Sequence, residues 1–247
     1  MADTKTVLVL GGTSDIGRAT ALRYAEAGWA VQLAARDAAE GERVRADIAT
    51  RTGVPVTLHR LDILDTAGFG AVLDGLPALP DTAVCVIGLL GEQARSEADP
   101  AEAARVMRSN FEGPALLLEA LAARFAARGR GTLVGVSSVA GDRGRASNYV
   151  YGAAKAGLTA YLAGMRHRLA RLGVTVITVK PGFVRTRMTA GMPLPGPVTA
   201  APREVAEAIF RADARGRPRS LYVRRVWWPI MTLIRLLPEP VFLRTRL

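Results

Sequence analysis

The chain has 247 residues, of which 49% are hydrophobic and 22% charged, so we expect one large α/β domain or two small ones with a sizeable core. A single cysteine excludes an internal disulfide, and two isolated histidines leave no zinc constellation, so we expect no metal site. The formal charge of +11 comes without a nucleic-acid-binding motif, and we expect no nucleic-acid partner.

The first residues lead directly into a strand pattern, so we expect no signal peptide. No apolar run approaches the roughly 18–20 residues that span a bilayer. Cys85 lies within the apolar run "AVCVIG", where we expect it to fill the core. These features predict a cytoplasmic, reducing location.

Apolar runs alternate with amphipathic stretches along most of the chain. Most of the runs are continuous, as in strands that are covered on both faces. Their alternation with helices predicts a doubly wound α/β fold with a parallel sheet. The predicted strands are 7–10, 30–35, 54–58, 83–87, 132–136, 174–179 and 221–223, and the predicted helices are 18–28, 38–51, 65–75, 100–127, 148–172 and 203–213.

The first strand runs into "LGGTSDIGRAT", a glycine-rich turn before a helix. Such a turn lets a pyrophosphate approach the backbone at the helix N-terminus, although a tight strand–helix turn has the same glycines. An acid at Asp15 would repel phosphate, and we expect it to cap the helix instead. The predicted cofactor contacts here are Gly11, Thr13, Ser14, Asp15, Ile16 and Gly17.

The second strand, in "VQLAARD", predicts which nucleotide binds. Sites selective for NAD usually end this strand with an acid, but here Ala35 occupies that place and Arg36 follows. A guanidinium suits a 2′-phosphate, so we expect NADPH/NADP+, with NAD and a plain surface arginine as the alternatives. In "RLDIL", Asp62 and Ile63 are expected to bracket the adenine.

The stretch "SNYVYGAAKAG" contains two tyrosines and one of only three lysines in the chain. Residues four apart share a helix face and residues six apart do not, so Lys155 is predicted to serve Tyr151 rather than Tyr149. A nearby ammonium stabilises phenolate, and we expect it to lower the pKa of Tyr151 towards neutrality. This pair alone is weak support, because the same spacing is common on solvated helices.

Two further polar residues strengthen the hypothesis of a catalytic site. Ser138, in "VGVSSVAGDRG", follows a predicted strand and precedes Tyr151 by 13 residues, so its hydroxyl is expected beside the phenol. Asn110, in "VMRSNFEGP", falls inside a predicted helix, where asparagine is a poor helix former. It is either merely tolerated there or holds a water that links Lys155 to solvent.

Together, "GGTSDIG", "LDI", "SNFEG", "SSVAG", "YGAAK" and "KPGFVRTRM" resemble the short-chain dehydrogenase/reductase family over residues 6–223. The resemblance implies a Rossmann-type sheet of about seven parallel strands and a reductase of the class that interconverts alcohols and carbonyls. It also implies a homodimer or homotetramer. The implied tetrad is Asn110, Ser138, Tyr151 and Lys155, of which Tyr151 and Lys155 would also contact the cofactor. Further implied cofactor contacts are Gly88, Pro181, Gly182, Val184 and Thr186.

The chain departs from the family pattern at "CVIG", in place of Asn-Asn-Ala-Gly, and at Asp15. These departures, with "AGDRGRASNYVYG", resemble the branch of mycobacterial decaprenylphosphoryl 2-keto-ribose reductases, which implies a keto-sugar on a polyprenyl phosphate. The alternatives are a reductase of small or acyl-carrier-bound ketones and an NADPH-binding scaffold without catalysis.

The predicted domain covers residues 1–223, including a lid at 186–201, and residues 224–247 form an apolar, basic extension. Residues 203–247 contain ten arginines against four acidic residues, and the apolar block near Trp228 is too short to span a bilayer. We expect the extension either to lie on an anionic membrane, at its inner face, or to pack on the protein.

Overall fold

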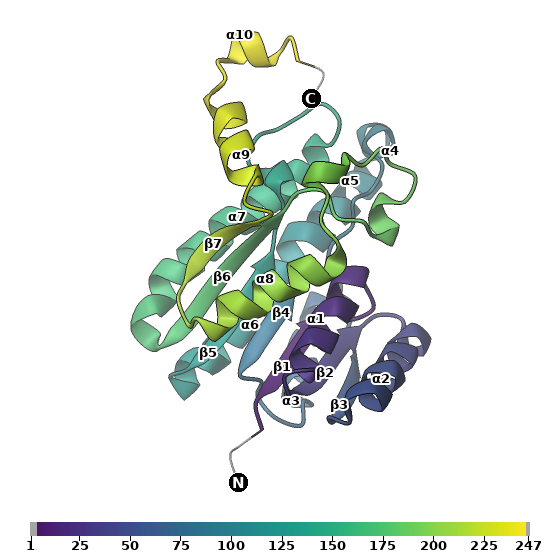
Figure 1. Ribbon diagram of the computed structural model, residues 1–247, viewed down its shortest axis with the longest axis vertical. Helices are drawn as coiled ribbons and strands as arrows, with labels where there is room; N and C mark the ends of the chain where they lie inside the picture. The colour runs from purple at the N-terminus through teal and green to yellow at the C-terminus, as the bar shows by residue number, and fades with distance from the viewer. Residues whose placement is uncertain (1–3, 246–247) are drawn as a thin grey trace.

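The computed structural model describes residues 4–245, whose centre is a seven-stranded parallel sheet flanked by helices (Figure 1). The strand order is β3-β2-β1-β4-β5-β6-β7, so the chain adds β2 and β3 on one side of β1 and β4 to β7 on the other. This change of side, between β1 and β4, creates a crevice at the carboxyl ends of the parallel strands. The doubly wound Rossmann-type fold is therefore confirmed. The strands are β1 (Thr6–Leu10), β2 (Ala30–Ala35), β3 (Val56–Arg60), β4 (Thr82–Cys85), β5 (Gly131–Val136), β6 (Val174–Pro181) and β7 (Arg219–Val223).

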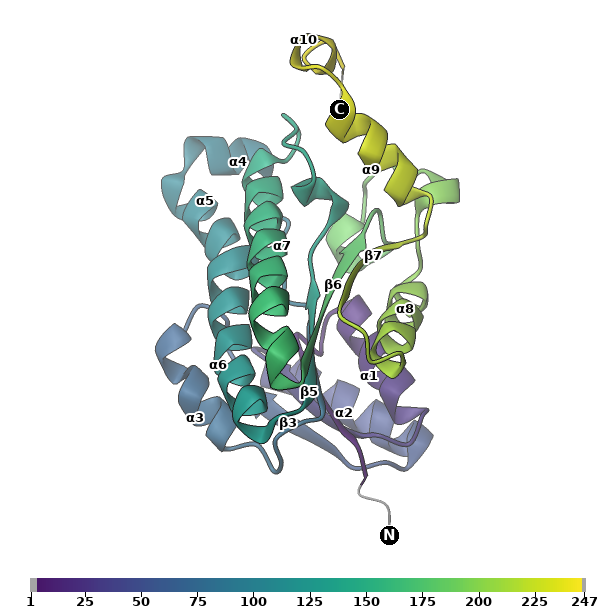
Figure 2. The same ribbon diagram turned by 90° about the vertical axis from the view of Figure 1, so that its left-hand side faces the viewer.

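Helices cover both faces of the sheet, as Figure 2 shows, with α1, α2 and α8 on one side and α3, α6 and α7 on the other. Consecutive side chains of β1 alternate between two apolar cores, with Val7 and Val9 in one and Leu8 and Leu10 in the other. This explains the continuous apolar run. The helices are α1 (Asp15–Ala25), α2 (Ala38–Thr52), α3 (Phe69–Asp74), α4 (Gln93–Ala98), α5 (Pro100–Met107), α6 (Gly113–Arg128), α7 (Tyr149–Leu169), α8 (Pro202–Ala214), α9 (Trp227–Leu236) and α10 (Glu239–Phe242).

Our prediction of a single long helix at 100–127 is wrong. A π-helical turn, Arg108–Glu112, separates α5 from α6 and contains Asn110. At the junction, a Cβ on Gly113 would lie 2.3 Å from the carbonyl oxygen of Ile63, so α6 begins against the chain that follows β3. Turns of this kind widen a helix by one residue and are frequent at functional sites.

Several predicted boundaries also shift by a few residues. Helix α1 begins at Asp15, and the chain leaves it before Gly28, whose φ of 81° a helix does not accommodate. Strand β3 starts after Pro55, which has no N–H to donate to the sheet. Strand β4 ends at Cys85 rather than at 87, although the N–H of Val86 still donates to the carbonyl oxygen of Leu10 at 3.0 Å.

The C-terminal extension forms α9 and α10, which project from the end of the molecule where the carboxyl ends of the strands lie (Figure 1). One face of α9 buries Trp227 and Met231 against Val139. The Arg143 guanidinium donates to the carbonyl oxygens of Ile234 and Leu237, both at 2.6 Å, and so caps the C-terminus of α9. Among the described residues, none of the helices is both long enough and apolar enough to cross a bilayer.

Candidate active site

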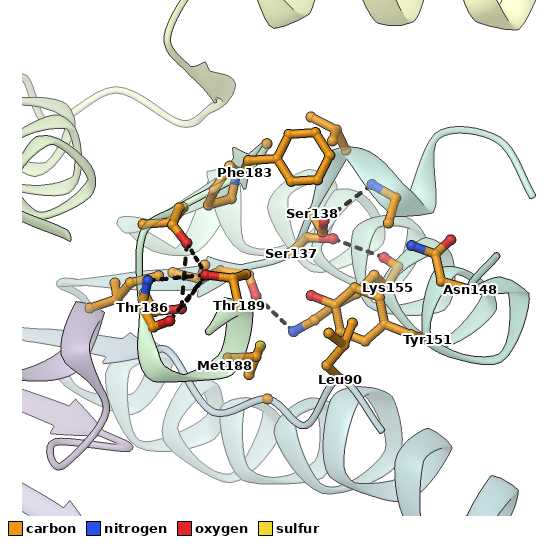
Figure 3. Close-up of a pocket in the computed structure, with 18 of the residues that line it drawn as sticks. Leu90, Ser137, Ser138, Asn148, Tyr151, Lys155, Phe183, Thr186, Met188 and Thr189 are labelled. Carbon is orange, nitrogen blue, oxygen red and sulfur yellow. Dashed lines mark hydrogen bonds between the residues drawn. The ribbon is translucent and has the colours of Figure 1, made fainter. Parts of the chain in front are cut away.

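A cavity opens at the carboxyl ends of the central strands, beside the N-terminal half of α7 (Figure 3). It brings together nine residues that the sequence singled out from separate motifs. Three of the four tetrad residues line it, whereas Asn110 lies behind its wall. The nine are Ile16, Gly88, Ser138, Tyr151, Lys155, Pro181, Gly182, Val184 and Thr186.

Helix α7 presents Tyr151 and Lys155 to the cavity on successive turns. The Lys155 ammonium lies 5.8 Å from the centre of the Tyr151 ring, and the phenol points into the cavity beside it (Figure 3). Tyr149 stands at the start of the helix and is 46% exposed. The geometry therefore pairs Lys155 with Tyr151, as the spacing predicted.

Lys155 is a buried cation, with 3% of its surface exposed. Its ammonium donates to the carbonyl oxygen of Val136 at 3.1 Å, and among the described residues this is its one hydrogen-bond acceptor. Burial lowers the pKa of Lys155 to about 8. The amine thus keeps donors free towards the cavity while it remains largely charged at neutral pH.

The expected lowering of the Tyr151 pKa is wrong for the chain alone. Burial raises the pKa of Tyr151 to about 12, and the Ser138 hydroxyl opposes that rise only in part. Desolvation disfavours the phenolate more strongly than the nearby polar groups favour it. The phenol is therefore protonated at neutral pH.

Ser138 is the second residue after the carboxyl end of β5. Its Oγ accepts from the N–H of Ala140 at 3.1 Å, which leaves the hydroxyl hydrogen free to donate. The short turn Val139–Gly141 then packs against α7, where a Cβ on Gly141 would lie 2.6 Å from the backbone nitrogen of Ala156. This contact fixes Ser138 relative to Tyr151.

Asn110 is fully buried in the π-helical turn, just behind the cavity. Its side-chain amide donates to the carbonyl oxygens of Leu89 at 2.6 Å and Val106 at 2.8 Å, and its oxygen accepts from the N–H of Leu89 at 3.2 Å. A Cβ on Gly88 would come within 3.0 Å of that oxygen and 3.4 Å of the Lys155 ammonium. Asn110 therefore braces the segment after β4, which "CVIG" leaves without polar side chains.

The glycine-rich turn between β1 and α1 has little room for side chains. Gly11 has a φ of 89°, and a Cβ on Gly17 would lie 2.2 Å from the carbonyl oxygen of Gly11. Ser14, not Asp15, caps α1, because its Oγ accepts from the N–H of Gly17 at 3.0 Å. Our prediction of an Asp15 cap is wrong by one residue. Thr13 and Ile16 complete the turn as partly exposed residues.

Asp15 instead reaches across to the loop after β6. Its carboxylate accepts from the N–H of Arg187 at 2.7 Å and lies 3.4 Å from the Arg187 guanidinium, which also donates to the carbonyl oxygen of Thr13. The base of the loop is closed where Val184 pairs with Ala200. The predicted lid is thus tied to the glycine-rich turn.

The residues expected at the adenosine end lie around the ends of β2 and β3. Arg36 is exposed directly after β2 and makes no ion pair with the described residues. Asp62 accepts from the N–H of Leu64 at 3.0 Å. The Ile63 side chain is 8% exposed and packs in the core, so it offers an adenine less surface than we expected.

Sequence reasoning missed several cavity residues, and Trp227 is the clearest case. A Cβ on Gly182 would lie 1.9 Å from the Trp227 indole, which also packs edge-on against Phe183 and donates from its Nε1 to the carbonyl oxygen of Val198 at 3.0 Å. The tail was noted for its aromatics, but no sequence signal links it to Gly182. Arg145 and Asn148 also line the cavity and were not predicted.

Residues 5–194 match the family model for short chain dehydrogenase. The chain is 39% identical over 241 residues to an uncharacterised oxidoreductase of Mycobacterium tuberculosis (strain H37Rv), covering 96% of both chains. A solved short chain dehydrogenase/reductase family protein superimposes with a TM-score of 0.78 at 32% identity, over 89% of this chain and 95% of that one. A short-chain dehydrogenase from Sphingobium yanoikuyae, solved in complex with NADPH, has the same fold, with a TM-score of 0.80 at 24% identity over 95% and 97%.

The family model covers most of the chain, the relative from Mycobacterium tuberculosis is named an oxidoreductase, and the solved family protein shares the fold. The chain belongs to the short-chain dehydrogenase/reductase family of oxidoreductases, which act on alcohol and carbonyl groups.

Proposed function

We propose that this enzyme interconverts a ketone and a secondary alcohol, with Tyr151 as the proton donor and NADPH as the cofactor. The observation that carries the proposal is the convergence of Ser138, Tyr151 and Lys155 in one largely apolar cavity. Bound NADPH would supply the hydride, while the protein supplies orientation and the proton.

Tyr151 is suited to the direction of reduction. Because its pKa is about 12, the phenol holds its proton at neutral pH and can give it to the oxygen of the carbonyl as negative charge develops there. The free hydroxyl hydrogen of Ser138 can donate to the same oxygen and fix its position. The phenolate that forms then lies near the Lys155 ammonium, which stabilises it.

Lys155 and Asn110 support this step from the far side of the cavity. The remaining donors of the Lys155 ammonium would hold the ribose hydroxyls of the cofactor. We assign Asn110 the task of bracing Gly88 and Leu89, so that the backbone passes close to Lys155. A relay of protons through a water on Asn110 stays a prediction.

The residues at the other end fit a phosphorylated dinucleotide. The glycine-rich turn keeps side chains away from the first turn of α1, whose opening N–H groups have no acceptor within the helix. The Asp15 carboxylate is engaged by Arg187, which moderates its repulsion of phosphate. Arg36 is exposed where a 2′-phosphate would lie, and this favours NADPH over NAD.

For the substrate, we propose a lipid-like carbonyl compound, such as a keto-sugar on a polyprenyl phosphate. The outer face of α9 exposes Trp228, Leu233 and Leu236 at 62%, 64% and 75%, close to arginines 225 and 235. Apolar side chains among cations suit the headgroup region of an anionic membrane. The extension would hold the enzyme at the inner membrane face, with the mouth of the cavity at the surface.

One alternative concerns the substrate. Small or acyl-carrier-bound ketones would need no membrane, and α9 would then serve only to close the cavity with Trp227.

Exposed apolar residues on α5 and α6, Met107 at 43% and Leu116 at 45%, support a homodimer or homotetramer through these helices.

The test is NADPH oxidation by the purified protein with a panel of ketones that includes a polyprenyl-phosphate ketopentose. We expect turnover by the wild type, loss of about 10³-fold in Tyr151→Phe, and little change in the control Tyr149→Phe. Turnover that survives Tyr151→Phe would refute the proposed proton donor. Reduction of small ketones alone would favour the alternative substrate class.

A further inference from the structure

The charged residues that line the cavity are all cationic. Of the residues that line it, two are cationic, Lys155 and Arg145, and none is acidic. Lys155 has a place in the proposed mechanism, beside Tyr151 and the ribose. Arg145 has none, and it lies in the loop between the turn that follows Ser138 and the start of α7.

Arg145 is also unusual for the partners that it lacks. Within residues 4–245 its guanidinium makes no ion pair, and its Nε is buried without a hydrogen-bond partner. Burial lowers its pKa, a sign that the environment does not compensate the charge. A buried, unsatisfied donor on a cation is costly unless a ligand satisfies it.

The neighbouring Arg143 shows what a structural arginine looks like in the same loop. Its guanidinium donates to the carbonyl oxygens that end α9, pairs with Glu239 at 3.1 Å and stacks on the Phe242 ring at 3.9 Å. Two residues apart, one arginine is satisfied by the protein and the other faces the cavity. Among the described residues, no carboxylate compensates the charge of Arg145, and its buried Nε has no acceptor.

Asn148 lies one turn further along and repeats the pattern. Its N–H donates to the carbonyl oxygen of Arg145 at 3.1 Å, so the two residues form one turn. Its side chain lies beside Tyr151 in the cavity (Figure 3), and its Oδ1 is buried without a partner among the described residues. A donor and an acceptor thus stand unsatisfied close to the proposed proton donor.

We propose that Arg145 binds an oxyanion of the substrate, a carboxylate or a phosphate, and that Asn148 accepts a hydrogen bond from a neighbouring hydroxyl. This inference rests on the proposed function, since it assigns the polar end of the same substrate. The apolar part would lie against Phe183, Met188 and Trp227. The substrate class is therefore an anionic ketone with an apolar body, whether the anion is free or part of a lipid headgroup.

The experiment measures binding by isothermal titration calorimetry with NADP+ bound, so that the ketone probes cannot be reduced during the titration. The probes are geranyl phosphate against geraniol, 4-oxopentanoate against its methyl ester, and inorganic phosphate alone. We expect each anionic probe that carries carbon to bind at least about tenfold more tightly than its neutral partner, on the scale of a charge-assisted hydrogen bond. Tighter binding of geranyl phosphate than of both 4-oxopentanoate and inorganic phosphate would favour a lipid headgroup.

The variant Arg145→Met keeps the length of the side chain and removes its charge. We expect it to abolish the preference for anions while it leaves geraniol binding and NADPH affinity unchanged, and Arg145→Lys to restore part of the preference. The matched control is Arg171→Met, which replaces an exposed arginine just after the C-terminal end of α7, away from the cavity. A wild type that binds charged and neutral probes equally, or binds neither, overturns the inference, as does an Arg145→Met protein that keeps the preference.

The proposed function can fail separately from this inference. If NADPH does not bind or no ketone is reduced, while the anion preference persists and depends on Arg145, the reaction is wrong and the anion site stands. If ketones are reduced without any preference for charge, the reaction stands and the anion site falls.

Discussion

Two lysines are buried at the same end of the sheet, and they differ in their partners. Lys155 faces the cavity with a single backbone carbonyl as its acceptor, and its pKa falls to about 8. Lys180, on β6, lies 2.6 Å from the carboxylate of Asp142, which is only 3% exposed, and Tyr222 donates to the same carboxylate at 2.7 Å. One cation is compensated by the protein and the other is not.

The tyrosines beside the two lysines extend the comparison. The pKa values of Tyr151 and Tyr222 are both raised to about 12, but for different reasons. Burial raises the pKa of Tyr151 against the lowering effect of the Ser138 hydroxyl, whereas burial and the hydrogen bond to the Asp142 carboxylate together raise the pKa of Tyr222. Lys180 and Tyr222 have their polar groups satisfied by Asp142, whereas Lys155 and Tyr151 keep hydrogen-bonding groups that a ligand can use.

The largest expected difference is in catalysis. Replacement of Lys155 by methionine should lower kcat/KM for ketone reduction by roughly 10³-fold, because the proposed ribose contact and the proposed stabilisation of phenolate would both be lost. The fold should remain intact, which circular dichroism would check. Lys180→Met, assayed well below its unfolding temperature, should keep most of the activity, and an equal loss in both variants would remove the distinction drawn here.

The next largest effect is on stability, where we expect the Lys180 variant to lose more. Lys180→Met leaves the Asp142 carboxylate buried without its cation, and we expect a loss of about 3–5 kcal/mol in the free energy of unfolding. Denaturant titration would measure this. The double variant Lys180→Met with Asp142→Leu should recover much of the loss, and failure to recover would show that the cation does more than neutralise Asp142.

The pH dependence of stability sharpens the contrast further. The pKa of Lys155 is about 8 in the folded protein and near 10.5 when unfolded, so between these values the unfolded chain binds more protons and stability rises with pH. The gap between wild type and Lys155→Met should therefore change in favour of wild type from pH 8 to pH 10.5, by at most about 1.4 kcal/mol per pH unit. A gap that is constant over this window would contradict the assigned burial cost.

The smallest effect concerns an exposed ion pair, Asp15 with Arg187, which ties the loop to the glycine-rich turn. Arg187→Ala should lower the free energy of unfolding by less than about 1 kcal/mol. It should also make the loop at 186–201 more susceptible to limited proteolysis, with Arg203→Ala, near the loop but not in it, as the control. Unchanged cleavage of the loop would show that the pair does not restrain it.

The sequence anticipated the site where local geometry or parallel strands decide it. The spacing of Tyr151 and Lys155 fixes their common helix face, and Ser138 follows the end of β5, so both meet at the carboxyl edge of the sheet. Glycines at 11 and 17 mark the turn for the same reason, because backbone conformation there is set within a few residues. These inferences needed no knowledge of distant contacts.

Only the tertiary structure decided which polar groups find partners. Asp15 meets Arg187 across 172 positions of sequence, Arg143 reaches the end of α9 across 94, and Trp227 packs on Gly182 from the tail. The same holds for charge, since the sequence does not indicate that Asp142 lies beside Lys180 and that Lys155 has no such carboxylate. Burial and ion pairing depend on contacts between segments far apart in the chain, and those contacts exist only once the chain has folded.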